Sequence, residues 1–397
     1  MEDRPAKRWN RWHARLRLSV RGLMVLVLVL GVWFGLVVHR TRVQREAVAA
    51  IRRAGGQVSY DEKFLSDDEE LGGPSWKKWL VVHLGIDYFE NATEVAFYGA
   101  SRGGVFTFGT PLGKDVNDAM MAEVGKLRGL LSLDLDGESQ VTDAGLAHLR
   151  GLSRLQHLYL APMKFQGPGL ACLRGMSRLD HLNLGRLDLA DADLVHLEGL
   201  TTLTYLSVSG RRITDAGLAP LAALTNLEYL RITNSPITSA GLVHLGGLRL
   251  LELDLDDTRV ESLEPLKDLT MLRSLELNRT PINDVGLAPV AGFRNLKKLD
   301  LTRTRISDAG LASLAGLPNL NNLGLSRTQV SDTGLASLGS LPKLFLLGLE
   351  ETRVTDAGLT QVAWLPGRKI LFLHGTAVTA KGIAALLEKN PTMEIEH

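Results

Sequence analysis

The chain has 397 residues, of which 45 are Lys or Arg, 44 are Asp or Glu and one is cysteine. A single cysteine excludes a disulfide framework within one chain. The near-neutral total conceals an asymmetry: residues 1–53 hold 12 basic and 3 acidic side chains, a net charge of +9, which leaves −8 on the remainder. An acidic body without a basic stripe is not expected to bind nucleic acid.

An apolar stretch near the N-terminus predicts a membrane anchor. A basic tail, residues 1–21, precedes the apolar residues 22–39, which reach the short end of the length that spans a bilayer. The positive-inside rule keeps the N-terminus cytoplasmic, so we predict an uncleaved, single-pass signal anchor of bacterial type and an extracytoplasmic remainder. A cleaved signal peptide and a buried or interfacial helix are the alternatives, although no A-x-A-like site follows the apolar run.

Residues 40–92 are predicted to form a linker and an N-terminal cap. Val43 to Ala54 can continue as a helix that the following two glycines end. Trp76 to Leu84 is amphipathic enough for a capping helix, with contact to the membrane surface as the alternative. The first strand is expected at Thr93 to Phe97, and the insertion from Tyr98 to Val116 then either completes the cap or reaches a partner.

A tetrad similar to Asp-Ala-Gly-Leu returns at a nearly constant interval over more than half of the chain. Nine of the ten intervals between its leucine positions are 24 residues, and the interval from Leu242 to Leu263 is 21. Such a period is the signature of a repeat architecture. The positions are Leu146, Leu170, Leu194, Leu218, Leu242, Leu263, Leu287, Leu311, Leu335, Leu359 and Ile383.

Each repeat joins a strand pattern to a short helix pattern. Leu323 and Leu325 alternate with a residue that faces the other way, as in a strand that buries every second side chain. Ser331 is positioned to cap a helix, and Asp332 places negative charge on its first turn. A leucine then recurs every three residues, at Leu335, Leu338 and Leu341. Because one unit cannot bury both stripes, we expect repeats to stack into a solenoid with a parallel sheet inside and short helices outside.

The pattern L-x-x-L-x-L-x-x-T-x-V-T/S-D-A-G-L resembles the leucine-rich repeat, specifically its ribonuclease-inhibitor-like and F-box-associated varieties. The resemblance covers residues 93–397, about 12 repeats including a C-terminal cap. It implies an α/β, right-handed solenoid that acts as an interaction scaffold, and it names no ligand. Threonine stands where that family often has Asn or Cys, and its hydroxyl is expected to bond the backbone of an adjacent turn. These threonines are Thr258, Thr280, Thr304, Thr328, Thr352 and Thr376.

The candidate binding residues are those that strand alternation turns outward on the concave sheet. One group is an aromatic and imidazole stripe, and beside it lies an acidic step. Tyrosine and histidine supply contact area with a polar tip, and the acidic step favours a basic partner. The alternative is a purely structural role, because aromatic side chains stack well between strands. The candidates are His157, Tyr159, His181, Tyr205, Tyr229, Arg231, Glu252, Asp254 and Glu276, with Asp256 also in the acidic step.

The sequence contains no recognised catalytic motif, and we expect no enzyme activity, cofactor or metal. Neither a P-loop nor a G-x-S-x-G motif is present, and the glycines belong to the repeat turns. His148, Cys172 and His196 share one position on successive outer helices, interpreted as a partly exposed flank. Helices about 10 Å apart cannot place them on one zinc ion.

The sequence therefore predicts a membrane-anchored, extracytoplasmic repeat protein that binds a protein or peptide through its concave face. One alternative is a cell-envelope carbohydrate binder that uses the tyrosine and histidine side chains. The other is an F-box-like adaptor of a ubiquitin ligase, which would need an F-box helix set before the repeats, where the sequence has an apolar span instead.

Overall fold

The computed structural model describes residues 20–60, 86–88, 91–97, 116–135, 140–160, 168–185, 187–362 and 370–397. The chain divides into two compact units. One comprises residues 1–46 and 62–90, and the other comprises residues 47–61 and 91–397. The predicted helix at Trp76 to Leu84 and most of the Tyr98–Val116 insertion lie outside the described residues.

The first unit contains most of helix α1 (Val20–Arg53) and the short helix η1 (Ile86–Tyr88). Gln44 of α1 donates a hydrogen bond to Asp87 at 3.2 Å. As predicted, the helix runs on past the apolar residues, and a turn at Gly55, whose φ is +83°, ends it. By length and composition α1 is able to cross a membrane, and its large apolar side chains from Leu23 to Leu36 are exposed.

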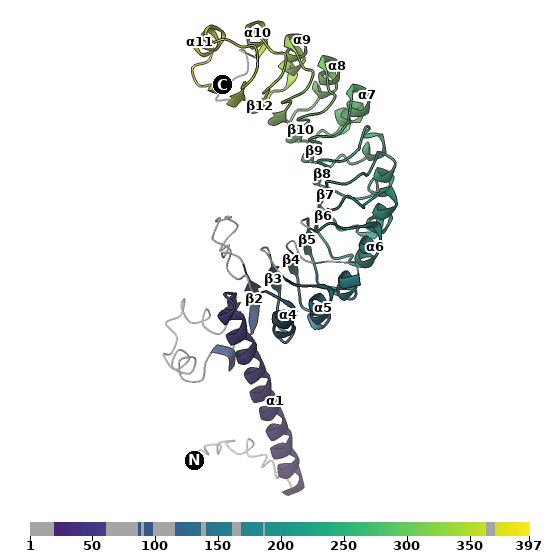
Figure 1. The fold of residues 1–397 in the computed structure, drawn as a ribbon, viewed down its shortest axis with the longest axis vertical. Coiled ribbons are helices and arrows are strands. Elements are labelled where there is room, and N and C mark those ends of the chain that lie inside the picture. The colour runs from purple at the N-terminus through teal and green to yellow at the C-terminus, as the bar shows by residue number, and fades with distance from the viewer. Residues whose placement is uncertain are drawn as a thin grey trace, which may run out of the picture. The chain divides into compact units, whose positions relative to one another are not determined.

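The second unit is built on a single 14-stranded sheet whose strands follow chain order. Strands β1 and β2 are antiparallel, and every later pair is parallel. Figure 1 shows the strands along the inner side of this unit. They are β1 (Gln57–Tyr60), β2 (Ala92–Ala96), β3 (Ser132–Leu135), β4 (His157–Leu160), β5 (His181–Leu184), β6 (Tyr205–Ser209), β7 (Tyr229–Thr233), β8 (Glu252–Asp254), β9 (Ser274–Glu276), β10 (Lys298–Asp300), β11 (Asn322–Gly324), β12 (Leu346–Gly348), β13 (Ile370–Phe372) and β14 (Glu394–Glu396).

Short helices line the outer side of the same unit (Figure 1). Five of them are a single α-turn that continues as a 3₁₀ turn, which suits leucines spaced three residues apart. The α-helices are α4 (Asp118–Val124), α5 (Asp143–Leu146), α6 (Asp191–Leu194), α7 (Asp284–Leu287), α8 (Asp308–Leu311), α9 (Asp332–Leu335), α10 (Asp356–Val362) and α11 (Ala380–Lys389). The 3₁₀ helices are η2 (Ala147–Gly151), η3 (Pro168–Leu173), η4 (Val195–Leu197), η5 (Asp215–Ala223), η6 (Gly241–His244), η7 (Glu264–Leu266), η8 (Ala288–Gly292), η9 (Ala312–Leu314) and η10 (Ala336–Ser340).

The core is a continuous column of leucines between the sheet and the outer helices. Leu323 is fully buried and pairs in register with Leu299 and Leu347 on the neighbouring strands. Leu335, Leu338 and Leu341 are likewise fully buried. The predicted stacking of strand and helix leucines is thus confirmed.

The Asp-x-Gly sequence recurs in the repeats for a physical reason that the sequence analysis did not predict, because the Asp of one repeat contacts the Gly of the next. Asp308 accepts a hydrogen bond from the backbone N–H of Ser331 at 2.7 Å and from its hydroxyl at 2.6 Å. A β-carbon on Gly334 would lie 2.4 Å from the Asp308 Oδ1 atom, so only glycine permits this approach. Burial pushes the pKa of Asp308 upward, but hydrogen bonds from Ser331, Thr333 and Gly334 outweigh it and lower the pKa.

Within the described residues, the same pair of bonds, from a backbone N–H and a hydroxyl to one carboxylate, links seven pairs of successive repeats, and we call it the aspartate ladder. Its members are Asp118–Thr142, Asp191–Thr214, Asp215–Thr238, Asp284–Ser307, Asp308–Ser331, Asp332–Thr355 and Asp356–Thr379. Ser331 does occupy the predicted N-cap, but its hydroxyl makes no capping bond to its own helix and donates to the preceding repeat instead.

Five of the six repeated threonines are buried, Thr376 is half-buried, and all six bond within their own repeat. The hydroxyl of Thr304, for example, donates to the carbonyl of Leu301 at 2.6 Å. The preceding residue, Arg303, has a φ of +58°, and its N–H donates to the Ser326 carbonyl of the next repeat at 2.8 Å. The hydroxyl therefore bonds the backbone of its own turn and not that of an adjacent turn, as had been expected, and backbone groups carry the link between repeats.

The short interval between Leu242 and Leu263 leaves the sheet register intact. Glu252 pairs with Tyr229 on one side and with Ser274 on the other. The aspartate ladder is interrupted here, because Ser239 occupies the aspartate position and its hydroxyl accepts from the backbone of Ser262 at 2.8 Å. The three residues by which this interval is shorter than the others are thus absent from the outer side and not from the strands.

The N-terminal end of the sheet differs from the prediction in one respect. The strand expected at Thr93 to Phe97 is present as β2, but it is not the first strand of the sheet. β1 precedes it and pairs antiparallel to it, although the sequence analysis placed these residues in the linker and cap. Phe97 and the buried α1 residue Ile51 belong to the same apolar core.

Candidate binding surface on the concave sheet

Outward-facing side chains form two columns across the concave sheet. In-register parallel pairing places corresponding residues side by side on neighbouring strands, about 4.8 Å apart. The first column is Ser132, His157, His181, Tyr205, Tyr229, Glu252, Ser274, Lys298, Asn322 and Leu346. The second column is Asp134, Tyr159, Asn183, Ser207, Arg231, Asp254, Glu276, Asp300, Gly324 and Gly348.

The predicted candidates therefore divide between the columns. His157, His181, Tyr205 and Tyr229 are consecutive in the first column, whereas Tyr159 lies in the second. Burial raises the pKa of the Tyr159 phenol, and nearby acidic groups add to the effect. The single predicted aromatic stripe is thus four residues long with one tyrosine beside it.

The imidazole end of the first column is held together by ring contacts and by one carboxylate. The rings of His157 and His181 meet edge to face at 4.9 Å, and His181 stacks on Tyr205 at 5.6 Å with an interplanar angle of 7°. Asp180, which directly precedes β5, places its Oδ1 atom 3.0 Å from His181 Nδ1 and 3.4 Å from His157 Nε2. Asp180 was not among the predicted residues, because it lies outside the strand alternation.

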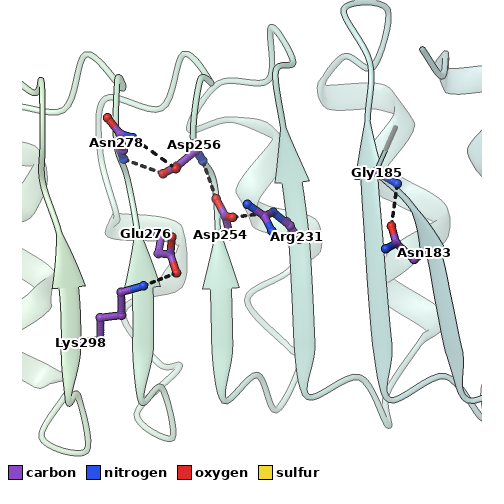
Figure 2. A network of polar contacts seen from close by, with 8 residues as sticks. All are labelled: Asn183, Gly185, Arg231, Asp254, Asp256, Glu276, Asn278 and Lys298. Carbon is purple, nitrogen blue, oxygen red and sulfur yellow. Dashed lines mark hydrogen bonds and ion pairs between the residues drawn. The ribbon is translucent and has the colours of Figure 1, made fainter. Parts of the chain in front are cut away.

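In the acidic step, Asp254, Asp256 and Glu276 already have partners. Arg231 Nε lies 2.7 Å from Asp254 Oδ2, and Lys298 Nζ lies 2.8 Å from Glu276 Oε1. Figure 2 shows these ion pairs on neighbouring strands. Lys298 was missed as a member of the network. Burial alone would lower the pKa of Lys298, but the hydrogen bond to Glu276 and the charges of Glu276, Asp300 and Asp254 together raise it.

Asp254 and Asp256 are close enough to influence one another. Asp254 accepts a hydrogen bond from the backbone N–H of Asp256 at 2.9 Å, and Asp256 accepts one from the backbone N–H of Asn278 at 2.7 Å (Figure 2). Burial, followed by the charge of Asp254, raises the pKa of Asp256 to about 7. Burial also raises the pKa of Asp254. The step therefore carries less negative charge near neutral pH than its composition indicates.

A pocket of about 110 Å³ opens where the tyrosines meet the acidic network. Glu252 on its wall is exposed and has no hydrogen-bond or ion-pair partner within the part of the chain that the structure describes. The wall is formed by Tyr205, Tyr229, Leu230, Arg231, Glu252, Leu253, Asp254, Ser274 and Glu276. Six of the nine predicted candidates line this one pocket.

Strand alternation also turns other positions outward, and the outer-helix positions can be compared with their prediction. Asp136 and Ala161, which continue the alternation beyond β3 and β4, lie outside the described residues. Ser207 and Asp254 are in outward positions but are buried by their neighbours. Cys172 is also buried, with only 4% exposed, so the expectation of a partly exposed flank is wrong for this residue.

Comparisons with known proteins agree with this architecture. Residues 114–363 match the leucine-rich repeat region family. An internalin (inlF) from Listeria monocytogenes is 22% identical over 76% of this chain and 86% of that chain, with a TM-score of 0.53. A leucine-rich repeat protein from Leptospira interrogans is 20% identical over 70% and 74%, with a TM-score of 0.52. A chain of the mouse RP105/MD-1 complex is 19% identical over 69% and 56%, with a TM-score of 0.50. No curated protein matches. At these identities the likeness concerns the fold.

Proposed function

Because the chain belongs to the leucine-rich repeat family, we propose that it is a membrane-anchored binding protein that holds a protein or peptide ligand on its concave sheet. The observation that carries this proposal is the pocket between Tyr205, Tyr229 and Glu252. Repeat scaffolds of this kind act through extended concave surfaces. In keeping with this, one structure of similar fold is that of RP105 in complex with MD-1.

The pocket favours a ligand with a basic side chain. Glu252 offers an exposed carboxylate, while Arg231 and Lys298 are engaged by Asp254 and Glu276 and do not neutralise it. Arginine or lysine of a ligand would pair with Glu252 and lie against the tyrosine rings, an arrangement that gains from both charge and cation–π attraction.

A purely structural role for the tyrosines is less well supported. Tyr205 and Tyr229 occupy a column that continues with Glu252, Ser274, Lys298 and Asn322, so stacking of the repeats does not require aromatic rings there. Tyrosine supplies a large contact area at low entropic cost, which is why it is common at recognition surfaces.

Site-specific photocrosslinking tests the binding site. A photoreactive amino acid in place of Tyr229 should crosslink a ligand in the native membrane. The same group in place of Val285 on the outer helix α7, where the side chain is 85% exposed, should not. Glu252→Gln should reduce the yield if the ligand is basic. Equal adducts from both positions would mean that the concave pocket is not the site, and a glycan adduct would favour the carbohydrate alternative.

The anchoring is part of the proposal and rests on α1 and the preceding basic tail. By length and composition α1 is able to span a bilayer, its large apolar residues from Leu23 to Leu36 are exposed, and the charge asymmetry favours a cytoplasmic N-terminus. The repeats would then lie outside the cytoplasmic membrane.

Cysteine labelling tests this topology with an internal control. Cys172 is the only cysteine and is buried, and burial raises the pKa of its thiol to about 12, so it should react poorly. In spheroplasts of a bacterial host, Val285→Cys should be labelled by a membrane-impermeant maleimide, whereas the unmodified chain should not be. Labelling of Val285→Cys only after lysis would place the repeats in the cytoplasm.

A further inference from the structure

We infer that His157, Asp180 and His181 form a binding site for a divalent transition metal ion of the zinc class. Two imidazole nitrogens and one carboxylate oxygen converge here, with all three ligand atoms within 4.8 Å of one another. This inference does not depend on the proposed ligand of the neighbouring pocket.

The separations of the ligand atoms fit a metal ion. Tetrahedral ligands placed about 2.0–2.2 Å from zinc lie roughly 3.3–3.6 Å from one another. The Asp180 Oδ1 atom is 3.4 Å from His157 Nε2, within this range, and 3.0 Å from His181 Nδ1, a hydrogen-bond contact that a bound ion would replace. Only small side-chain rotations would be needed to place one ion between the three atoms.

The architecture of the sheet brings the ligands together. His157 and His181 are in-register neighbours on β4 and β5, and Asp180 directly precedes His181. Tyr205 stacks on the His181 ring and so limits its rotation. In the outer-helix column, by contrast, Cys172 is buried, and no ligand cluster joins it to His148 or His196 among the described residues.

The chemistry of the ligands suits a first-row transition metal. Imidazole favours zinc, copper, iron and nickel over magnesium and calcium, and one carboxylate adds compensating charge. The side chains of His157, Asp180 and His181 are 37–38% exposed. A site with three protein ligands and access to solvent leaves a fourth position for water or for a group from a ligand.

Metal titration of the full-length chain tests the inference. The protein is purified in detergent with a histidine-free tag, stripped with chelator and titrated with Zn²⁺ by calorimetry. We expect one equivalent to bind, and binding should raise the melting temperature by mass action. His157→Gln, His181→Gln and Asp180→Asn should each weaken affinity by more than the roughly 10–100-fold typical of losing an outer-shell partner.

His244→Gln is the matched control, because His244 is a partly buried histidine on the outer side of the solenoid. It should bind Zn²⁺ as the unmodified chain does. Co²⁺ absorption provides a readout that needs no variant, since nitrogen and oxygen ligands in tetrahedral geometry give an intense visible band. Failure to bind one equivalent, or unchanged affinity in the three site variants while they keep native circular dichroism, would overturn the inference.

Discussion

On the outer side of the solenoid the aspartate ladder repeats one hydrogen-bonding pattern seven times, whereas no two neighbouring strands from β3 to β12 present the same pair of outward residues on the concave side. Both faces are built on the same period and the same register. Residues that return with the period satisfy the demands of stacking, and residues that change along the columns are free to serve a ligand. The contrast therefore distinguishes, within each repeat, the residues that hold the repeats together from the residues that can bind a ligand.

The largest loss of stability should come from a core position that lies between the sheet and the outer helices. Leu323 is fully buried between Leu299 and Leu347, so Leu323→Asp would place an unpaired carboxylate in the leucine column. We expect it to lower the free energy of unfolding by about 4 kcal/mol or more. Thermal melting of the detergent-solubilised chain would measure this. A melting temperature like that of the unmodified chain would mean that the strand register is wrong.

Breaking the aspartate ladder should have the next largest effect. Asp308→Ala removes the acceptor of the backbone N–H and the hydroxyl of Ser331 and of the hydroxyl of Thr333. We expect urea unfolding curves to show a loss of about 2–4 kcal/mol. Asp268→Ala removes an exposed carboxylate outside the ladder and should change stability by less than about 0.5 kcal/mol. Equal effects of the two variants would show that the ladder contributes nothing.

The leucine column was predictable because its period is visible in the sequence and has only one physical meaning. The aspartate ladder was not, because Asp308 and Ser331 lie 23 residues apart and each has a sufficient local role, in dipole stabilisation and in capping. On the concave face, alternation predicted which residues point outward. It could not predict that Arg231 covers Asp254, or that Asp180, outside the strand, reaches both histidines. Those contacts depend on side-chain conformation across strands.

The raised pKa of Asp256 in the acidic step should make the free energy of unfolding depend on pH. The pKa of Asp256 is about 7 in the folded chain, against about 3.9 when unfolded. Between these values the folded chain retains a proton that the unfolded chain releases, so the free energy of unfolding falls as pH rises. Asp256→Asn cannot ionise and should be more stable than the unmodified chain at pH 8 by about 1–3 kcal/mol.

At pH 4, below the folded pKa, the same pair should differ by less than about 0.5 kcal/mol. Urea unfolding at both pH values measures the change. If the difference between the two proteins does not grow from pH 4 to pH 8, Asp256 ionises as an exposed aspartate does, and the acidic step then carries its full negative charge at neutral pH.

The smallest effect is expected one residue away from the largest. Asn322 precedes Leu323 but faces outward in the first column, where its neighbours are Lys298 and Leu346. Asn322→Asp should change stability by less than about 0.5 kcal/mol, because the new carboxylate stays hydrated and lies beside a lysine. Melting curves recorded beside those of Leu323→Asp give the comparison. A loss approaching that of Leu323→Asp would show that the concave columns are as constrained as the core, and aperiodic residues there would no longer point to a ligand.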